Sequence, residues 1–198
     1  KDAVLNVKLT LTGKITEGMR VAYFLTPDVT SGAIPCAFAA DPDSLILSGD
    51  IEAAEHIEFK EAVKNPLKWS AEKPYLYKLT FELYEPDASI ERSELKVGFR
   101  KCEMKDGLMC INGKRIVFNG VNRHEFSCVN GRAISYEDTK YDIINMKKNN
   151  INALRTCHYP DAEFVYDLCD EYGLYVICEN NMESHGSWAN IYAGMTTK

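Results

Sequence analysis

The segment GLYVICENNMESHG, from Gly173 to Gly186, decides which fold we expect and where its chemistry lies. Gly173 suits the position just after a helix, because glycine readily takes the positive φ that ends many helices. The run from Leu174 to Cys178 is short, apolar and rich in β-branched and aromatic residues, which indicates a strand buried on both faces. Ionisable residues begin directly after it, at Glu179. Parallel α/β proteins bind ligands at the carboxyl ends of their strands, so this segment predicts a site there.

The second half of the chain repeats this alternation of strand and helix. Ser135 is a candidate helix N-cap, and Asp138, three residues later, is its candidate capping-box partner. Asn112-Gly113 is a strong signal for a hairpin turn. Short loops between alternating elements predict parallel strands joined by right-handed crossovers. The expected elements are a strand at 116–118, a helix from 135 to about 149, a strand at 151–156, a helix from 160 to 172 and the strand at 174–178.

Residues 1–102 follow the two-residue alternation of strands that bury one face. Apolar residues alternate with polar ones from Leu5 to Leu11, and again from Tyr77 to Leu83, where Thr80 is expected to face water. Short alternating strands separated by turn residues predict an all-β sandwich of immunoglobulin-like size. We therefore expect a sandwich at 1–102 and an α/β domain at 103–198.

The overall composition argues against several classes of binding partner and of structural site. A formal net charge of −6 argues against nucleic acid or an anionic membrane surface, and no apolar run approaches the roughly 18 residues of a membrane span. The seven cysteines are odd in number and irregularly spaced, which argues against a disulfide framework or a zinc ribbon. We expect buried free thiols in a reducing, cytoplasmic compartment. Adjacent side chains seldom meet, so Cys157 and His158 do not predict a cysteine nucleophile.

Ionisable side chains follow each of the three expected parallel strands. His124 follows the first strand, His158 the second, and Glu183 and His185 the third. Neighbouring strands lie roughly 5 Å apart, so these groups are expected on one rim. Each also has another explanation: a loop histidine is commonly structural, Glu183 and His185 could bind a metal, and Arg155 could bridge surface carboxylates. Their joint occurrence at three strand ends favours a functional site.

Seven segments of the chain resemble glycoside hydrolase family 2, and within it the β-galactosidases. The segments, in the order in which the family has them, are NPLKWSAEKPYLY at 65–77, VGFR at 97–100, NGK at 112–114, GVNRHE at 120–125, NNINALR at 149–155, HYP at 158–160 and CDEYGLY at 169–175. They cover most of the chain from Asn65 onward. Arg123, and the segment from Glu183 to Gly186, are similar to galactosidases rather than to glucuronidases.

The resemblance implies a fold, a site and a cofactor. The fold is an immunoglobulin-like sandwich followed by a (β/α)₈ barrel, of which this chain holds about three parallel strands. By the same resemblance, His124 and His158 contact the galactosyl hydroxyls and stabilise the transition state, and Arg155 lies near the nucleophile. Glu183 and His185 are implied to be ligands of an active-site Mg²⁺, whose third protein ligand the chain lacks.

The two catalytic glutamates of the family have no match in the chain. Retaining glycosidases place two carboxyl groups about 5 Å apart, as nucleophile and as acid/base. In the family these come from later barrel strands, with the acid/base in an Asn-Glu pair, and no Asn-Glu follows residue 103. We therefore expect a fragment of a retaining β-galactosidase that acts on terminal β-D-galactosides, is inactive alone, and belongs with the remainder of a homo-oligomeric parent enzyme. The alternatives are a β-glucuronidase, another family 2 β-glycosidase and a non-catalytic docking module.

Overall fold

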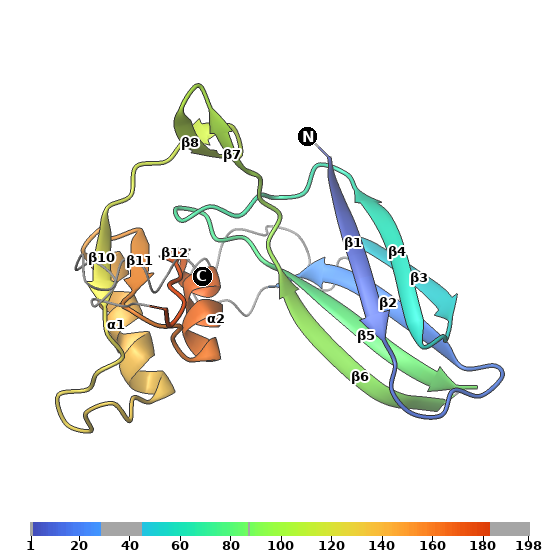
Figure 1. Ribbon diagram of the computed structural model, residues 1–198. Helices are drawn as coiled ribbons and strands as arrows, with labels where there is room; N and C mark the ends of the chain where they lie inside the picture. The colour runs from blue at the N-terminus through green and yellow to red at the C-terminus, as the bar shows by residue number, and fades with distance from the viewer. Residues whose placement is uncertain (1, 29–44, 87, 183–198) are drawn as a thin grey trace, which may run out of the picture. The chain divides into compact units, whose positions relative to one another are not determined.

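The chain forms two compact units in the computed structural model (Figure 1). The residues that the structure describes are 2–28, 45–86 and 88–182. We call the first unit, Lys1–Ile116 with Asp170–Gly173, the β unit, and the second, Val117–Cys169 with Leu174–Lys198, the α/β unit. The domain boundary near residue 103 remains a prediction. Within the described ranges, no helix is long and apolar enough to cross a membrane.

Two antiparallel sheets form most of the β unit. The smaller sheet pairs β1 (Ala3–Thr10) with β4 (His56–Val63). The larger sheet has the strand order β3 (Leu47–Glu52), β2 (Arg20–Pro27), β5 (Tyr77–Glu85) and β6 (Ala88–Val97). The alternating segments of the sequence therefore form the strands β1 and β5.

Both sheets contribute side chains to one hydrophobic core. On β1, Leu5 and Val7 are buried while Asn6 between them is exposed, as in a strand with one buried face. Thr80 on β5 is only 5 % exposed, so the expectation that it faces water is wrong. The reason is its central position, because Phe24 of β2 and Glu94 of β6 are its register partners on either side.

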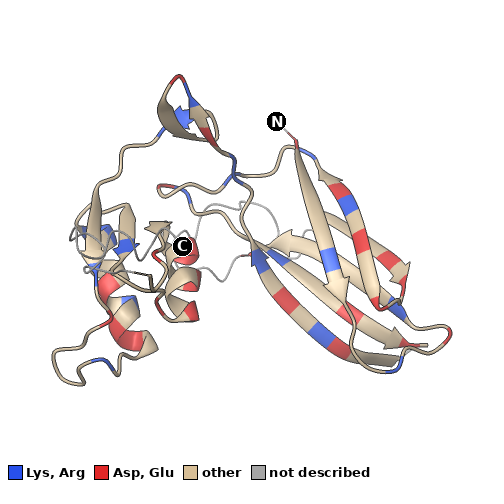
Figure 2. Ribbon diagram, viewed as in Figure 1, with Lys and Arg blue, Asp and Glu red and all other residues tan. Residues whose placement is uncertain are grey.

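The outer strand β6 carries alternating acidic and basic residues (Figure 2). Arg92 lies 3.1 Å from Glu82 and 2.6 Å from Glu94, and Lys78 lies 3.7 Å from Glu94. Paired charges on an outer strand disfavour its pairing with a strand of another molecule. This edge of the sheet is therefore protected from aggregation.

A small sheet of β7 (Cys102–Lys105), β8 (Leu108–Ile111) and β9 (Lys114–Arg115) ends the β unit. The predicted turn at Asn112-Gly113 joins β8 to β9, with φ of 51° and 80°. Asp106-Gly107 turns the chain between β7 and β8 in the same way, with φ of 51° and 74°. Both turns need the left-handed region, which Asn, Asp and Gly tolerate.

The α/β unit contains the predicted β-α-β-α-β order. Its parallel strands lie in the order β10 (Gly120–Arg123), β11 (Ala153–Thr156) and β12 (Tyr175–Ile177). Helix α1 (Tyr136–Lys148) connects the first two strands, and α2 (Glu163–Tyr172) connects the second and third. The expected parallel pairing is therefore confirmed for all three strands.

Two predicted element starts are wrong. The first parallel strand begins at Gly120 rather than at 116, because the Ile116 N–H donates to the Met109 carbonyl and so extends the preceding hairpin. Helix α2 begins at Glu163 rather than at Pro160. The Asp161 N–H instead donates to the Tyr166 hydroxyl at 3.0 Å, so this part of the chain forms a loop before the helix.

The predicted caps of both helices are confirmed. Ser135 Oγ accepts from the Asp138 N–H at 3.1 Å, and Asp138 Oδ2 accepts from the Ser135 N–H at 3.1 Å, which completes a capping box. The hydrogen bond that the Ser135 hydroxyl donates to Asp138 Oδ2 at 2.8 Å, followed by the one from the Ser135 N–H, lowers the pKa of the Asp138 carboxyl. Gly173 follows α2 with φ of 78°, in the left-handed region that ends many helices.

Candidate functional site

The carboxyl ends of the three parallel strands bring the predicted histidines together. His124 directly follows β10, and His158 lies two residues beyond β11. Their ring centroids are 5.6 Å apart, with an angle of 80° between the ring planes. Since neighbouring strands lie about 5 Å apart, this separation is what adjacent strand ends produce.

Glu179, two residues beyond β12, connects Arg155 to His158. Its Oε1 accepts from Arg155 Nε at 2.6 Å and lies 2.5 Å from Arg155 Nη2 in an ion pair, and its Oε2 lies 3.0 Å from His158 Nδ1. Hydrogen bonds from His158 and then from Arg155 lower the pKa of the Glu179 carboxyl. The Glu179 N–H donates to Thr156 Oγ1 at 3.0 Å, and Arg155 Nη1 donates to Asn122 Oδ1 at 3.3 Å. Arg155 is a predicted site residue, whereas Glu179 is expected only as the first ionisable residue after the third strand, with no role of its own.

His124 has its own set of partners, which the sequence did not indicate. Its Nδ1 lies 3.3 Å from the Tyr159 hydroxyl, and Arg132 Nη1 donates to the same hydroxyl at 3.0 Å. The Arg132 guanidinium also lies 5.4 Å from the centre of the Tyr159 ring, in the range of a cation–π contact. His124 and Arg132 lie in the loop between β10 and α1, and Tyr159 lies in the loop between β11 and α2, so two loops meet at this hydroxyl.

A buried ion pair lies next to the histidines. Arg123, the last residue of β10, reaches Asp161 Oδ2 at 3.0 Å, Asp142 Oδ2 at 3.3 Å and Thr139 Oγ1 at 3.2 Å. Burial, followed by the negative charge of Glu125, raises the pKa of Asp161, although Arg123 acts in the opposite direction. Arg123 therefore anchors helix α1 and the β11–α2 loop to the strand end that carries His124.

The predicted metal ligands Glu183 and His185 lie outside the described residues. Among residues 2–28, 45–86 and 88–182, no three His, Cys, Asp or Glu side chains lie close enough together to hold a metal ion. The magnesium site remains a prediction.

Cysteine chemistry has little support in this region. Among the described residues the cysteines form no disulfide bond, and Cys157 is buried with its Sγ donating to the Arg155 carbonyl at 3.5 Å. Cys102, Cys128 and Cys178 are exposed, so the expectation that the thiols are buried is only partly right; Cys36 lies outside the described residues.

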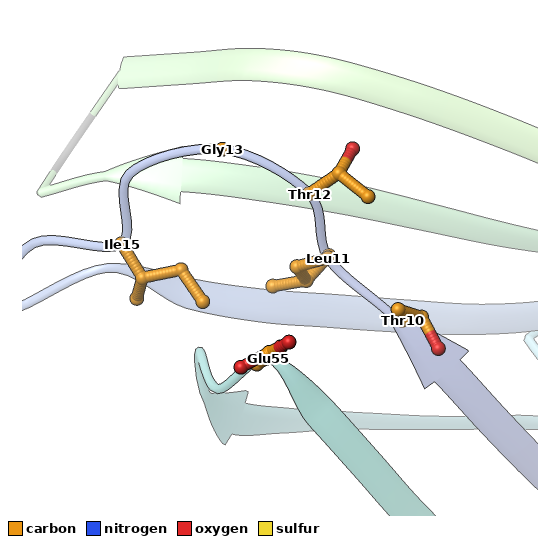
Figure 3. Close-up of a pocket in the computed structure, with 6 residues that line it drawn as sticks. All are labelled: Thr10, Leu11, Thr12, Gly13, Ile15 and Glu55. Carbon is orange, nitrogen blue, oxygen red and sulfur yellow. The ribbon is translucent and has the colours of Figure 1, made fainter.

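A hollow in the β unit does not compete with the strand ends as a site (Figure 3). Glu55 is its one ionisable side chain, beside the Thr10 and Thr12 hydroxyls and the apolar Leu11 and Ile15. A single carboxylate without a second ionisable group offers no acid/base pair. The cluster around Glu179 is therefore the candidate site.

Comparison with known proteins matches nearly the whole chain. A family model described as "Glycosyl hydrolases family 2" matches residues 1–100, and one described as "Glycosyl hydrolases family 2, TIM barrel domain" matches residues 102–197. A beta-galactosidase of Priestia megaterium is 54% identical over 140 residues, which cover 70% of this chain and 14% of that protein. A beta-galactosidase of Lactobacillus delbrueckii subsp. bulgaricus is 52% identical over 138 residues, again 70% of this chain and 14% of that protein.

Solved structures give a second comparison. The beta-glucuronidase of Parabacteroides merdae with glycerol in its active site aligns with a TM-score of 0.80 at 26% identity, covering 98% of this chain and 24% of that one. A Bifidobacterium dentium beta-glucuronidase complexed with coumarin-3-O-glucuronide aligns with a TM-score of 0.77 at 25% identity, covering 90% of this chain and 26% of that one. The chain thus spans between a seventh and about a quarter of these proteins.

Proposed function

Because the chain belongs to glycosyl hydrolase family 2, we propose that the protein that carries it hydrolyses terminal β-D-galactosides with retention of configuration. The observation that carries the proposal is the paired imidazoles of His124 and His158 beside the Arg155–Glu179 ion pair, at the ends of three parallel strands. Relatives that are 54% and 52% identical to this chain over 140 and 138 aligned residues are named beta-galactosidases, which supports the choice of sugar.

The family match makes the α/β unit the start of a TIM barrel domain, so β10, β11 and β12 are barrel strands. For the β unit we propose an immunoglobulin-like sandwich. Its support is the pair of antiparallel sheets that share one core.

Within this site His124 and His158 would contact sugar hydroxyls. Retaining hydrolysis also needs two carboxyl groups about 5 Å apart, one of them free to exchange a proton. The carboxylates at these strand ends already serve other partners: Glu179 accepts from Arg155 and His158, and Glu125 Oε1 accepts from the Ala162 N–H at 2.9 Å. We therefore propose that the nucleophile and the acid/base come from other parts of the protein, and that this chain alone turns over no substrate.

We propose that the protein binds Mg²⁺ through Glu183 and His185, as the family resemblance implies. A Mg²⁺ ion there would supply positive charge next to the sugar. No step that we assign to the described residues depends on it.

Hydrolysis by the full-length protein tests the function. We expect cleavage of an aryl β-D-galactoside, with NMR showing that the β-anomer of galactose appears first, as retention requires. Hydrolysis with inversion, or no hydrolysis of any aryl β-glycoside, would contradict the proposal. The isolated chain should release no aryl alcohol under the same conditions.

The second candidate is a β-glucuronidase, which the solved relatives favour. Identity of 54% to a beta-galactosidase against 26% to a beta-glucuronidase makes it the weaker candidate. A higher kcat/KM on the aryl β-D-glucuronide than on the matched galactoside would reverse this order.

A further inference from the structure

We propose that Glu179 is a positioning residue that keeps the proton of His158 on Nδ1, so that Nε2 accepts a hydrogen bond from a sugar hydroxyl. The sugar contact rests on the proposed function. The tautomer rests only on the contacts among Glu179, His158 and Arg155.

The position of the proton follows from the partners of His158 Nδ1. Glu179 Oε2 lies 3.0 Å from this nitrogen, and Arg155 Nη2 lies 3.2 Å from it. A guanidinium only donates and a carboxylate only accepts, so the two neighbours favour opposite tautomers. Without a proton, Nδ1 would accept from Arg155 but would direct its lone pair at an anionic oxygen. With a proton, it forms a charge-assisted hydrogen bond to Glu179.

Arg155 does not need His158 as an acceptor. Its Nε already donates to Glu179 Oε1 at 2.6 Å, its Nη2 lies 2.5 Å from the same oxygen in an ion pair, and its Nη1 donates to Asn122 Oδ1 at 3.3 Å. Glu179 Oε2, in contrast, has the His158 ring as its closest donor. The Nδ1–H tautomer therefore satisfies both neighbours, whereas the other tautomer leaves an oxygen and a nitrogen lone pair facing each other.

The carboxylate is also held in place. The Glu179 N–H donates to the hydroxyl of fully buried Thr156, which fixes the backbone at the end of β12. His158 Nε2 makes no hydrogen bond to any described residue and the side chain is 38% exposed, so this nitrogen remains available to a ligand. An Nδ1–H imidazole can only accept at Nε2, which selects a hydroxyl proton.

Neutron diffraction from deuterium-exchanged crystals of the full-length protein tests the tautomer. We expect deuterium on His158 Nδ1, directed at Glu179 Oε2, and none on Nε2. In the Glu179→Gln variant Arg155 should take the amide oxygen, so that the amide NH₂ faces Nδ1 and moves the deuterium to Nε2. Deuterium on Nε2 in the unmodified protein, alone or with Nδ1, would overturn the proposal.

Kinetics test the consequence for the sugar. Glu179→Gln should lower kcat/KM for an aryl β-D-galactoside about ten-fold, the typical loss of one hydrogen bond. On the deoxygenated galactoside that lacks the hydroxyl bound by His158, the same variant should have nearly the kcat/KM of the unmodified protein. Adding Glu179→Gln to His158→Phe should then lower kcat/KM no further, because the two substitutions remove the same hydrogen bond to the sugar.

Asp167→Asn is the control, because Asp167 is an exposed carboxylate in the middle of α2, and it should leave kcat/KM unchanged. If Glu179→Gln lowered kcat/KM by the same factor on every deoxygenated galactoside, the positioning role of Glu179 would be overturned. If the protein cleaves no aryl glycoside, the proposed function fails, while the deuterium position still decides the tautomer.

Discussion

Among single residues, Arg123 joins three segments at the strand ends. Its 5% exposed side chain contacts Asp161, Asp142 and Thr139, so it joins β10 to α1 and to the β11–α2 loop. The Asp161 side chain is fully buried, and its Oδ1 has no hydrogen-bond partner among the described residues. His124 follows Arg123 directly in the chain, so its position depends on this ion pair.

Replacing Arg123 with Met should leave Asp161 as a buried anion without its cation, which costs about 3–5 kcal/mol. Burial and the charge of Glu125 already raise the pKa of Asp161 above its ordinary value of 3.8. An acid whose pKa is higher in the folded state than in the unfolded state contributes its full stabilisation below the unfolded-state pKa. This stabilisation is lost as the pH rises through the folded-state pKa. The destabilisation should therefore be large at about pH 7 and smaller at about pH 4.

Urea unfolding of the full-length protein at both pH values measures this difference. Asp142→Asn is the control, because the Asp142 side chain is 42% exposed and exposed pairs contribute little. An equal loss of stability at both pH values in Arg123→Met would show that the charge of Asp161 is not the cause.

The sequence was sufficient to place His124, His158 and Arg155 at strand ends, because the residue that follows a strand depends on the local pattern. It was not sufficient to show their partners. Glu179 meets His158 across two strands, and Tyr159 meets Arg132 across two loops, so both contacts depend on loop conformation. The one sequence signal for Glu179 is its place as the first carboxylate after the apolar run of the third strand.

At the scale of elements, the distance between β10 and β11 depends on a glycine. A Cβ at Gly120 would lie 3.0 Å from the Ala153 Cβ and 3.2 Å from the Ala153 carbonyl oxygen. Such contacts are tighter than side chains normally make, so the strands approach closely only because Gly120 has no side chain.

Gly120→Val should therefore destabilise the α/β unit by about 1–3 kcal/mol, as overpacking does. Adding Ala153→Gly removes the closest atom and should restore part of the loss. Thermal unfolding of the full-length protein and both variants measures this. If the double variant were no more stable than Gly120→Val alone, the destabilisation would not come from the contact with the Ala153 side chain.

The capping box of α1 gives a second prediction for an element. Ser135→Ala removes the acceptor for the Asp138 N–H and should cost about 1 kcal/mol. Hydrogen exchange of the first turn of α1 should become about five-fold faster, which corresponds to that free energy. Ser135→Asn keeps a capping oxygen and should retain the protection; equally fast exchange in Ser135→Asn would contradict the capping role.

At the scale of the whole molecule, the parallel sheet of the α/β unit ends, among the described residues, at two outer strands. β10 and β12 are the outer strands of the three, and Val117, Phe118 and Ile177 near them are exposed. Exposed apolar side chains beside an outer strand favour association with further protein. The sequence predicted the strand order, but the number of strands that complete the sheet depends on contacts beyond local pattern.

We expect the isolated chain to self-associate. Sedimentation velocity at increasing concentration should show growing species, and a dye for apolar surfaces should bind. Ile177→Lys should reduce both effects, because a charge at this edge opposes strand pairing, while Ile90→Lys on β6 is the matched control at another exposed isoleucine. A monomer at all concentrations that binds no dye would contradict the expectation.

Within the part of the chain that the structure describes, the contacts that orient the two imidazoles lie between Asn122 and Glu179. One continuous stretch of coding sequence therefore specifies both histidines and the residues that orient them. A recombination crossover outside that stretch keeps each histidine together with the residues that orient it. A crossover inside it combines a histidine from one ancestor with partners from another, so hybrid enzymes joined there should lose activity far more often.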